Sequence, residues 1–311
     1  MKTEVFLGID TSNYTTSAAV FHNGKIVQNK KLLPVAAGQK GLRQSDAVFS
    51  HIRQIDEVLS PLLREFSNIS LVGVSDRPRA AANSYMPCFM AGVAFAEITA
   101  AAKGAEVLRF SHQQGHIAAA LYSADKLHWL KERFIAFHVS GGTTEALFVT
   151  PNENHMPMAE LIAESTDLKA GQAIDRAGVM MELGFPCGPA LEKLSLMCDE
   201  KIDYKPTMLG KNCSLSGIEN KCKSFLEKGK SKEYIAKFCI EAVIRSLAAM
   251  YEEITKEYGK LPVLFSGGVT ANKTMRERFE TAYGAAFASP EFAADNAAGT
   301  AILAKIMRCG L

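Results

Sequence analysis

The spacing of hydrophobic positions predicts strands that alternate with helices along the chain. Short apolar runs indicate buried strands, and apolar residues three and four positions apart indicate amphipathic helices. The Asn23-Gly24 pair predicts a tight hairpin turn between two of the strands. In the first part of the chain, strands are predicted at residues 4–9, 16–21, 26–33, 71–75 and 106–110, and helices at 45–66, 87–103 and 112–123.

The same order of elements begins again near residue 133. An apolar run enters a polar turn, a second strand follows, and a third strand comes before a series of helices. In this part, strands are predicted at 133–139, 145–150, 160–166 and 263–265, and helices at 171–184, 188–198, 216–228, 232–258, 272–283 and 295–308.

The openings of the two parts are alike, with FLGIDTSNYTTSAAVF in the first and AFHVSGGTTEALFV in the second. Each is an apolar strand, a turn of Gly, Ser, Thr or Asp, and a second strand reached through two threonines. Chance similarity of two such units is the alternative, but the order of the elements that follow also repeats. We therefore predict two duplicated α/β lobes whose polar turns face a shared central cleft.

The composition of the chain excludes several classes of protein. The 311 residues carry a formal net charge of +2, so no global basic field points to nucleic acid. Apolar runs fall short of the ~18 residues of a membrane helix, and the N-terminus reads into a strand without a signal peptide. The seven cysteines form no Cys-x-x-Cys pair, which excludes a zinc ribbon. We expect a soluble cytoplasmic protein with no membrane partner.

Three polar turns are candidates for holding a phosphate chain. Ser140-Gly141-Gly142-Thr143 and Ser266-Gly267-Gly268 each follow a predicted strand and offer backbone N–H groups and hydroxyls. Asp10 lies at the first turn, where a carboxylate can hold a metal-nucleotide through water, and it is the candidate catalytic residue. The chain has neither a Walker A sequence nor a G-x-G-x-x-G after a strand, so P-loop and Rossmann sites are disfavoured.

His112 and His116 are four residues apart on a predicted helix, so both imidazoles project from one face. That arrangement suits a divalent transition metal, although most histidine pairs on helices are surface or core residues. His138 and Asp295 are the candidates for further ligands. Gln113 occupies the position of the general-base Glu of zincin proteases, which disfavours proteolysis by that route.

Several motifs together resemble the TsaD family, formerly called O-sialoglycoprotein endopeptidase or Gcp. The matching segments, in order, are LGIDTS at 7–12, the His112/His116 pair, VSGGT at 139–143, GQAID at 171–175, GPALEK at 188–193, SLSG at 214–217, SGGV at 266–269 with Asn272, and DNAA at 295–298. The resemblance implies two actin-like ATPase (ribonuclease H-like) lobes. We expect an N-terminal lobe at 1–110, a C-terminal lobe with a helical insertion at 111–294, and a helix at 295–311 that closes back on the N-terminal lobe.

The resemblance also implies a function. The family transfers a threonylcarbamoyl group from its adenylate to N6 of an adenosine in tRNA, with iron or zinc and an ATP- or AMP-type nucleotide, with or without Mg²⁺. It further implies partner subunits of a tRNA-modification complex. The implied metal ligands are His112, His116 and Asp295, with His138 where relatives use Tyr; the implied nucleotide-binding residues are Ser140, Gly141, Gly142, Thr143, Asp175, Gly188, Glu192, Gly267, Gly268 and Asn272.

The chain departs from the family pattern on one side. Tyr14 and Thr15 stand where the family has acidic residues, one of them a catalytic candidate. A loop of the family is replaced by residues 38–46, ending at His51, and its Gly-Pro-Gly turn by residues 75–79. Three arginines on this side are candidates for phosphate contacts: Arg43, Arg77 and Arg79.

These departures leave alternatives to transfer onto tRNA. One is a carbamoyl-type transferase of the same fold that acts on a small molecule. Another is a non-catalytic nucleotide-binding subunit of a tRNA-modification complex, which the loss of acidic residues at 14 and 15 would favour. Peptidase activity is disfavoured because no nucleophile-base pair is visible.

Overall fold

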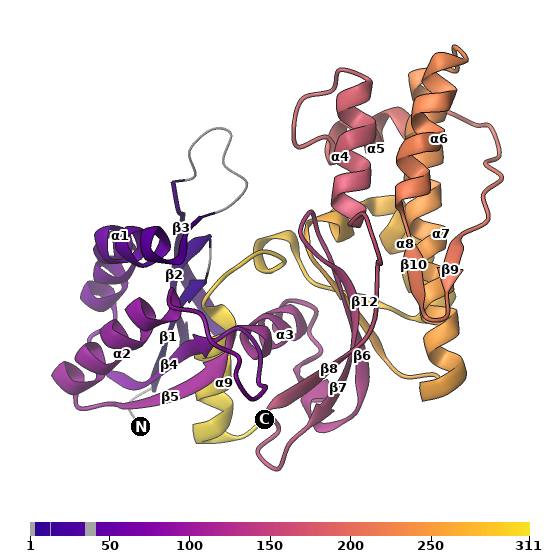
Figure 1. Ribbon diagram of the computed structural model, residues 1–311. Coiled ribbons are helices and arrows are strands. Elements are labelled where there is room, and N and C mark those ends of the chain that lie inside the picture. Colours follow the sequence, from indigo (N-terminus) through magenta and orange to yellow (C-terminus); the bar gives the residue numbers. More distant parts are fainter. Residues whose placement is uncertain (1–3, 13, 35–41) are drawn as a thin grey trace. The chain divides into compact units, whose positions relative to one another are not determined.

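The computed structural model describes residues 4–12, 14–34 and 42–311. The chain divides into two compact units, each built around one five-stranded sheet (Figure 1). The first unit comprises Met1–Glu132, Thr150–Ala159 and Glu291–Leu311, and the second comprises Arg133–Val149 and Glu160–Pro290. In the described part of the chain, no helix is both long and apolar enough to cross a membrane.

The sheet of the first unit has the strand order β3-β2-β1-β4-β5. β1 pairs antiparallel with β2 and parallel with β4, and all eight of its residues are buried. Burial on both faces explains why its first five residues are apolar. Its last three residues, Asp10, Thr11 and Ser12, are buried polar groups that make side-chain hydrogen bonds. The strands are β1 (Val5–Ser12), β2 (Thr15–His22), β3 (Lys25–Leu32), β4 (Ile69–Arg77) and β5 (Glu106–Ser111).

Helices cover both faces of this sheet (Figure 1). α1 (Gln44–Glu65) and α2 (Phe89–Lys103) pack on one face, where they share a core with Leu7 and Ile9. α3 (His112–Ser123) and α9 (Ala298–Cys309) pack against each other on the opposite face. The short helix η1 (Leu127–Lys131) follows α3.

Glycines let α9 lie close to its neighbours. A Cβ at Gly8 of β1 would collide with the carbonyl oxygen of Ala297, and one at Gly73 of β4 with that of Thr300. A Cβ at Gly299 of α9 would collide with the carbonyl oxygen of Gly115 in α3. The absence of side chains at these positions therefore sets the distance at which the start of α9 meets α3 and the sheet.

The boundary between the units differs from the one expected at residue 110. Residues 111–132 belong to the first unit, because α3 packs on α9, β4 and β5. Residues 150–159, at the turn between β7 and β8, also belong to it. Both assignments follow from contacts with segments far away in the sequence. Local sequence patterns do not reveal such contacts.

The second sheet repeats the pairing of the first. Its order is β12-β11-β6-β7-β8, and β6 pairs antiparallel with β7 and parallel with β11, just as β1 does with β2 and β4. The duplication expected from the sequence is therefore present in the topology. The strands are β6 (Phe134–Val139), β7 (Thr144–Pro151), β8 (Pro157–Glu164), β11 (Val263–Ser266) and β12 (Ala286–Phe287).

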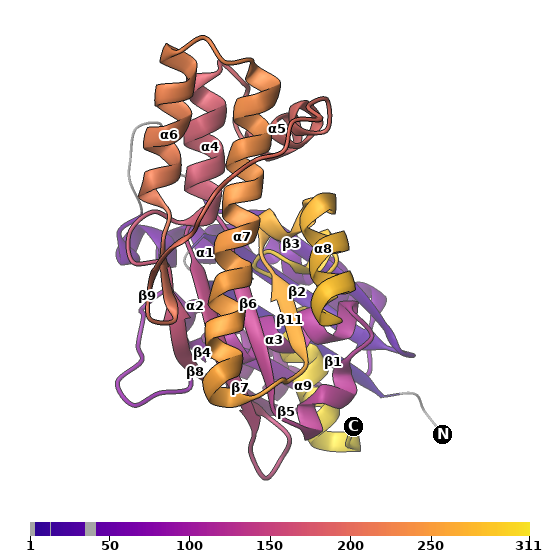
Figure 2. The ribbon, with the colours of Figure 1, turned by 90° about the vertical axis from the view of Figure 1, so that its right-hand side faces the viewer.

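A group of helices completes the second unit (Figure 2). The 27-residue α7 packs against α4, α5 and α6 and contributes the largest share of the core. A small hairpin, β9 (Thr207–Leu209) and β10 (Asn212–Ser214), was not expected from the sequence. Neither were the turns η2 (Gly268–Ala271) and η3 (Pro290–Phe292), the last two residues of which belong to the first unit. The helices are α4 (Ala170–Met180), α5 (Gly188–Ser195), α6 (Ser216–Glu227), α7 (Lys232–Tyr258) and α8 (Lys273–Tyr283).

Because α9 packs so closely, we expect replacing a glycine in this helix by alanine to destabilise the protein. Gly→Ala within a helix normally stabilises a protein by up to ~1 kcal/mol. We expect Gly299→Ala instead to lower the free energy of unfolding by about 1–3 kcal/mol, because the added methyl group meets the backbone of Gly115. Gly217 is the matched control, since it is the second residue of α6 as Gly299 is of α9, and a Cβ there meets open space. Urea unfolding that finds both variants equally stable would contradict this account.

Candidate functional site

The start of α3 is held by a capping box. The Ser111 hydroxyl accepts a hydrogen bond from the backbone N–H of Gln114, and the Gln114 side chain accepts one from the backbone N–H of Ser111. The cap fixes the first turn of the helix, so His112 and His116 present their rings on the same face. The i, i+4 prediction for this pair is confirmed at the level of geometry.

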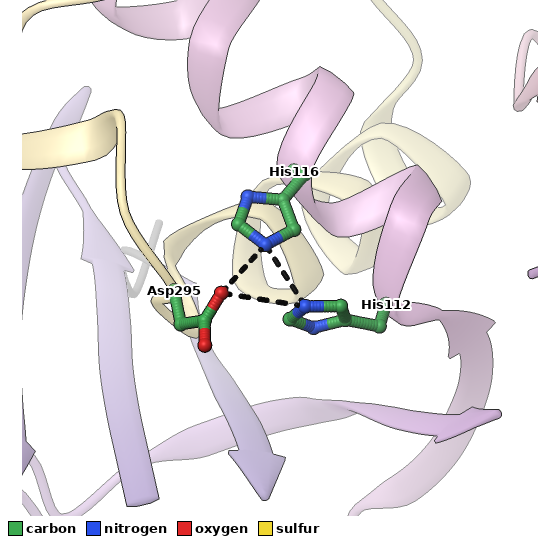
Figure 3. Close-up of side chains that lie close together, drawn as sticks. All are labelled: His112, His116 and Asp295. Carbon is green, nitrogen blue, oxygen red and sulfur yellow. Dashed lines mark hydrogen bonds and ion pairs between the residues drawn. The ribbon is translucent and has the colours of Figure 1, made fainter. Parts of the chain in front are cut away.

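Asp295, which lies just before α9, meets the two imidazoles (Figure 3). Its Oδ1 is 3.0 Å from His116 Nε2 and 3.5 Å from His112 Nε2, and the two Nε2 atoms are 2.9 Å apart. The three side chains are partly exposed, at 18–31%. One ligand atom from each therefore faces a common point that is open to solvent.

A second layer of polar groups surrounds these three side chains. His112 Nδ1 donates to Asp10 Oδ2 over 2.8 Å, and Asp10 is only 1% exposed. The hydroxyls of Ser12 and Thr15 donate to Asp295 Oδ2, over 3.2 and 3.5 Å. Every member of both layers belongs to the first unit.

Opposite charges in this cluster shift the pKa values in opposite directions. Burial lowers the pKa of His112, but the charge of Asp10 and its hydrogen bond, together with Asp295, raise that pKa to about 10. Burial raises the pKa of Asp295, but the hydrogen bonds and charges of His112 and His116 hold it well below its usual range. The pKa of Asp10 is lowered in the same way, by His112 against the effect of burial. Each of these shifts favours the charged form of a side chain that lies beside an opposite charge.

The donor set fits a divalent transition metal. Two imidazole nitrogens and one carboxylate oxygen, all within 4.8 Å of one another, form the His112–His116–Asp295 group. Separations of 2.9–3.5 Å are about those of atoms that share one ion bound at roughly 2.1 Å. Such a set accommodates iron, zinc and related ions, with positions left for other ligands.

Asp10 is buried, and both of its oxygens accept hydrogen bonds, from His112 and from the backbone N–H of Ser12. Its role as a catalytic residue that holds a metal-nucleotide stays a prediction. His138 lies in the second unit at the end of β6, with Nδ1 3.2 Å from Ser266 Oγ, and as a further ligand it stays a prediction.

The second unit contains a cavity of about 350 Å³ where many of the implied nucleotide-binding residues meet. Ile174, Ile240 and Val269 give it apolar walls. A largely apolar cavity with a few polar groups is typical of a small-molecule site. The implied binding residues that line it are Gly141, Asp175, Gly188, Glu192, Gly268 and Asn272.

Three polar side chains at this cavity also hold the backbone around it. Asp175 Oδ1 accepts from the N–H of Cys187, and Glu192 Oε1 accepts from the N–H of Lys273. Asn272 caps α8 by accepting from the N–H of Met275. Each carboxylate thus has one oxygen engaged by the protein, which fixes the direction of the other.

Four implied binding residues do not line the cavity: Ser140, Gly142, Thr143 and Gly267. They lie in the two adjoining turns. Within the first turn, the N–H groups of Gly142 and Thr143 donate to Ser140 Oγ. Gly267 has φ +100°, and a Cβ there would collide with Val139, so only glycine lets the two turns approach.

The structure describes most of the two segments that depart from the family pattern, the loop at 38–46 that ends at His51 and the turn at 75–79. His51 is fully buried on α1, and its Nδ1 lies 2.7 Å from the hydroxyl of Thr16. Residues 38–41 of the altered loop lie outside the described residues. Arg77 pairs with Asp76 over 2.6 Å, and the backbone N–H of Arg79 donates to Ser84 Oγ. Phosphate contacts by Arg43, Arg77 and Arg79 stay a prediction.

Asp167 is an organising carboxylate that the sequence analysis missed. It accepts hydrogen bonds from the hydroxyls of Ser214 and Ser216 and from the N–H groups of Leu168 and Leu215. These bonds join the loop before α4 to the start of α6. No local pattern signals this role, because Ser214 is 47 residues away along the chain and the fold brings the two together.

Comparison with known proteins identifies relatives over most of the chain. The family model TsaD, described as tRNA N6-adenosine threonylcarbamoyltransferase, matches residues 39–302. A protein of that name from Thermus thermophilus is 30% identical over 285 residues, which cover 89% of this chain and 84% of the relative.

Solved structures show the fold. Component A of the (R)-2-hydroxyglutaryl-CoA dehydratase of Acidaminococcus fermentans superposes with a TM-score of 0.53 at 17% identity, covering 98% of this chain and 97% of that one. HypF in its phosphate- and nucleotide-bound form gives a TM-score of 0.58 at 14% identity, covering 99% of this chain and 56% of that one. The chain therefore has the actin-like ATPase fold, as predicted from its sequence.

The Asp167 contacts predict a pH-dependent loss of stability. Burial raises the pKa of Asp167, but the hydrogen bonds from Ser214, Ser216 and two backbone N–H groups lower it well below its usual value. The carboxylate therefore stabilises the fold above the unfolded pKa of ~3.9, and that contribution is lost as the pH falls toward the folded pKa. We expect Asp167→Asn to melt at a lower temperature than wild type at pH 7 and the gap to narrow below pH 4. A gap that is constant from pH 7 to pH 3 would contradict this assignment.

Proposed function

Because the chain belongs to the TsaD family of tRNA N6-adenosine threonylcarbamoyltransferases, we propose that it is a transferase that modifies adenosine in tRNA. The finer proposal is transfer of a threonylcarbamoyl group from its adenylate to N6 of the adenosine. The observation that carries it is the meeting of His112, His116 and Asp295, the ligands implied by the family, although His116 and Asp295 are 179 residues apart.

The reaction is an acyl transfer. The N6 nitrogen attacks the carbonyl carbon of the threonylcarbamoyl group, the bond from that carbon to the phosphate oxygen breaks, and AMP leaves with its electron pair. The nitrogen loses one proton, which passes to solvent water. A divalent metal held by His112, His116 and Asp295 would supply a Lewis acid that anchors phosphate or polarises a carbonyl group.

The cavity of the second unit is proposed to hold the adenine nucleotide. The free oxygens of Asp175 and Glu192 suit ribose hydroxyls, and the amide of Asn272 suits the adenine edge. The apolar walls suit the face of the base. In the turn at 140–143, the N–H groups of Gly142 and Thr143 donate to Ser140 Oγ. The proposed phosphate donors are therefore the N–H groups of Gly141 and Gly268, which line the cavity. Because these groups are already held by backbone contacts, binding requires little rearrangement.

One observation favours the alternative of a nucleotide-binding subunit without turnover. Tyr14 and Thr15 stand where the family has acidic residues, and Thr15 lies in contact with Asp295. Partner subunits of a tRNA-modification complex would then supply the missing chemistry. This alternative predicts metal and nucleotide binding with no product.

Transfer onto tRNA provides the test. We expect the metal-loaded protein, given threonylcarbamoyl adenylate labelled in its threonine, to attach the label to unmodified tRNA, with the modified nucleoside identified by mass spectrometry. The His112→Ala/His116→Ala variant should lose at least ~100-fold in rate, because two of the three metal ligands are gone. His128→Ala, which replaces an exposed histidine, is the control and should keep the wild-type rate.

The outcomes separate the alternatives. The proposal is supported if the wild-type protein labels tRNA and the His112→Ala/His116→Ala variant does not. Label on a small acceptor, with none on tRNA, would favour the small-molecule transferase. Binding of zinc and AMP with no labelled product, alone or with partner subunits, would reject the enzyme and leave the binding subunit.

A second prediction concerns the affinity of the cavity for AMP. Glu192→Gln keeps an oxygen that can accept from the N–H of Lys273 but removes the charge. A hydrogen bond to a charged group contributes about 1.5–3 kcal/mol, so AMP affinity measured by calorimetry should fall about 10- to 100-fold. The exposed Glu277→Gln on α8 is the charge-matched control and should leave AMP affinity unchanged. Equal affinity for all three proteins would place the nucleotide elsewhere.

A further inference from the structure

We infer that Asp10, Ser12 and Thr15 are positioning residues for the metal centre, each acting through a ligand. The inference rests on the proposed function of His112, His116 and Asp295 as metal ligands. All three positioning residues come from one end of the β1–β2 pair, where Ser12 lies opposite Thr15 in the antiparallel register. They are at most 4% exposed, so the layer is shielded from competing water.

Asp10 decides which nitrogen of His112 is free. Its Oδ1 accepts from the N–H of Ser12 over 3.0 Å, and its Oδ2 lies 2.8 Å from His112 Nδ1. A carboxylate only accepts, so Nδ1 must carry the proton. The remaining nitrogen, Nε2, is the one that faces His116 and Asp295. Asp10 therefore holds the tautomer and ring orientation in which His112 can bind a metal.

Ser12 and Thr15 decide which oxygen of Asp295 is free. Both hydroxyls donate to Oδ2, whereas Oδ1 faces the two imidazoles. The carboxylate is thereby turned to offer one oxygen to the ion. At position 15 a hydroxyl donates where an acidic side chain would repel Asp295. The substitution of the family's acid by Thr15 is thus consistent with a retained metal centre rather than a degraded one.

Asp10→Asn is the sharpest test because it is nearly isosteric. The N–H of Ser12 still needs an acceptor, so the Asn oxygen should face Ser12 and the amide NH₂ should face His112. An NH₂ group donates, which forces Nδ1 to accept and moves the ring proton to Nε2, the ligand atom. We expect Zn²⁺ affinity, measured by competition with a chromogenic chelator, to fall about 10- to 100-fold. The absorption spectrum of the Co²⁺-substituted protein should change with it.

Thr15 provides a second, milder test. Thr15→Val removes only the hydroxyl and should weaken Zn²⁺ binding several-fold, while Thr15→Ser should restore it. Thr11→Val is the matched control from the same strand pair: its hydroxyl is also buried, but it contacts Cys88 and the N–H of Gly92 on α2 instead of a ligand. Thr11→Val should lower the melting temperature and leave Zn²⁺ affinity unchanged.

The outcomes distinguish this inference from the proposed function. Zn²⁺ affinity that stays within about twofold of wild type in both Asp10→Asn and Thr15→Val would overturn the positioning role and leave the metal centre intact. If Thr11→Val lost as much Zn²⁺ affinity as Thr15→Val, the loss would be due to general destabilisation of the fold. That result would also overturn the positioning role. A wild-type protein that binds neither Zn²⁺ nor Co²⁺ would reject the metal centre itself, and the positioning role with it.

Discussion

The candidate metal centre depends on how closely α9 approaches α3 and the first sheet. Three glycines permit this approach, Gly8 and Gly73 in the strands and Gly299 in α9. Only two residues, Asn296 and Ala297, separate Asp295 from α9, so the position of that helix sets the position of the carboxylate. A side chain at any of these three glycines would push α9 away from its neighbours and disturb the alignment of Asp295 Oδ1 with the imidazoles.

Duplication supplies each unit with a polar turn at the same topological place, and the two turns adjoin different candidate sites. The turn after β1 directs the hydroxyls of Ser12 and Thr15 at a ligand of the candidate metal centre. The turn after β6 presents its backbone beside the candidate nucleotide cavity. The strands on either side of both turns pair antiparallel, but the second turn is longer: Ser12 pairs with Thr15, whereas Val139 pairs with Thr144. A shared scaffold with exchanged turn residues is how one fold carries two kinds of site.

Both sites are held in place before any ligand is bound. At the metal centre, Asp10 orients His112 and two hydroxyls orient Asp295. At the cavity, Asp175, Glu192 and Asn272 each accept a backbone N–H while a second polar atom stays available. Groups fixed in this way lose little conformational freedom on binding, which preserves affinity and keeps the geometry specific.

The sequence by itself determined the elements, the duplication and the implied ligand pair. Apolar periodicity is local, so the strands and helices fall within a few residues of their expected places. The i, i+4 spacing of His112 and His116 is equally local, and it predicts two rings on one helix face. Recurrence of the same strand-turn-strand unit predicted the two sheets, which share one pairing pattern.

Only the tertiary structure decided what surrounds the ligands. Asp10 meets His112 across 102 residues and Ser12 meets Asp295 across 283, and no local pattern encodes either contact. The burial of Asp10 could not be read from its place at the first turn, and the expected boundary at residue 110 did not anticipate the packing of α3 on α9. These features arise because strand order and glycine-mediated helix packing bring distant segments together. The energy that selects those contacts belongs to the whole folded unit, not to any window of the chain.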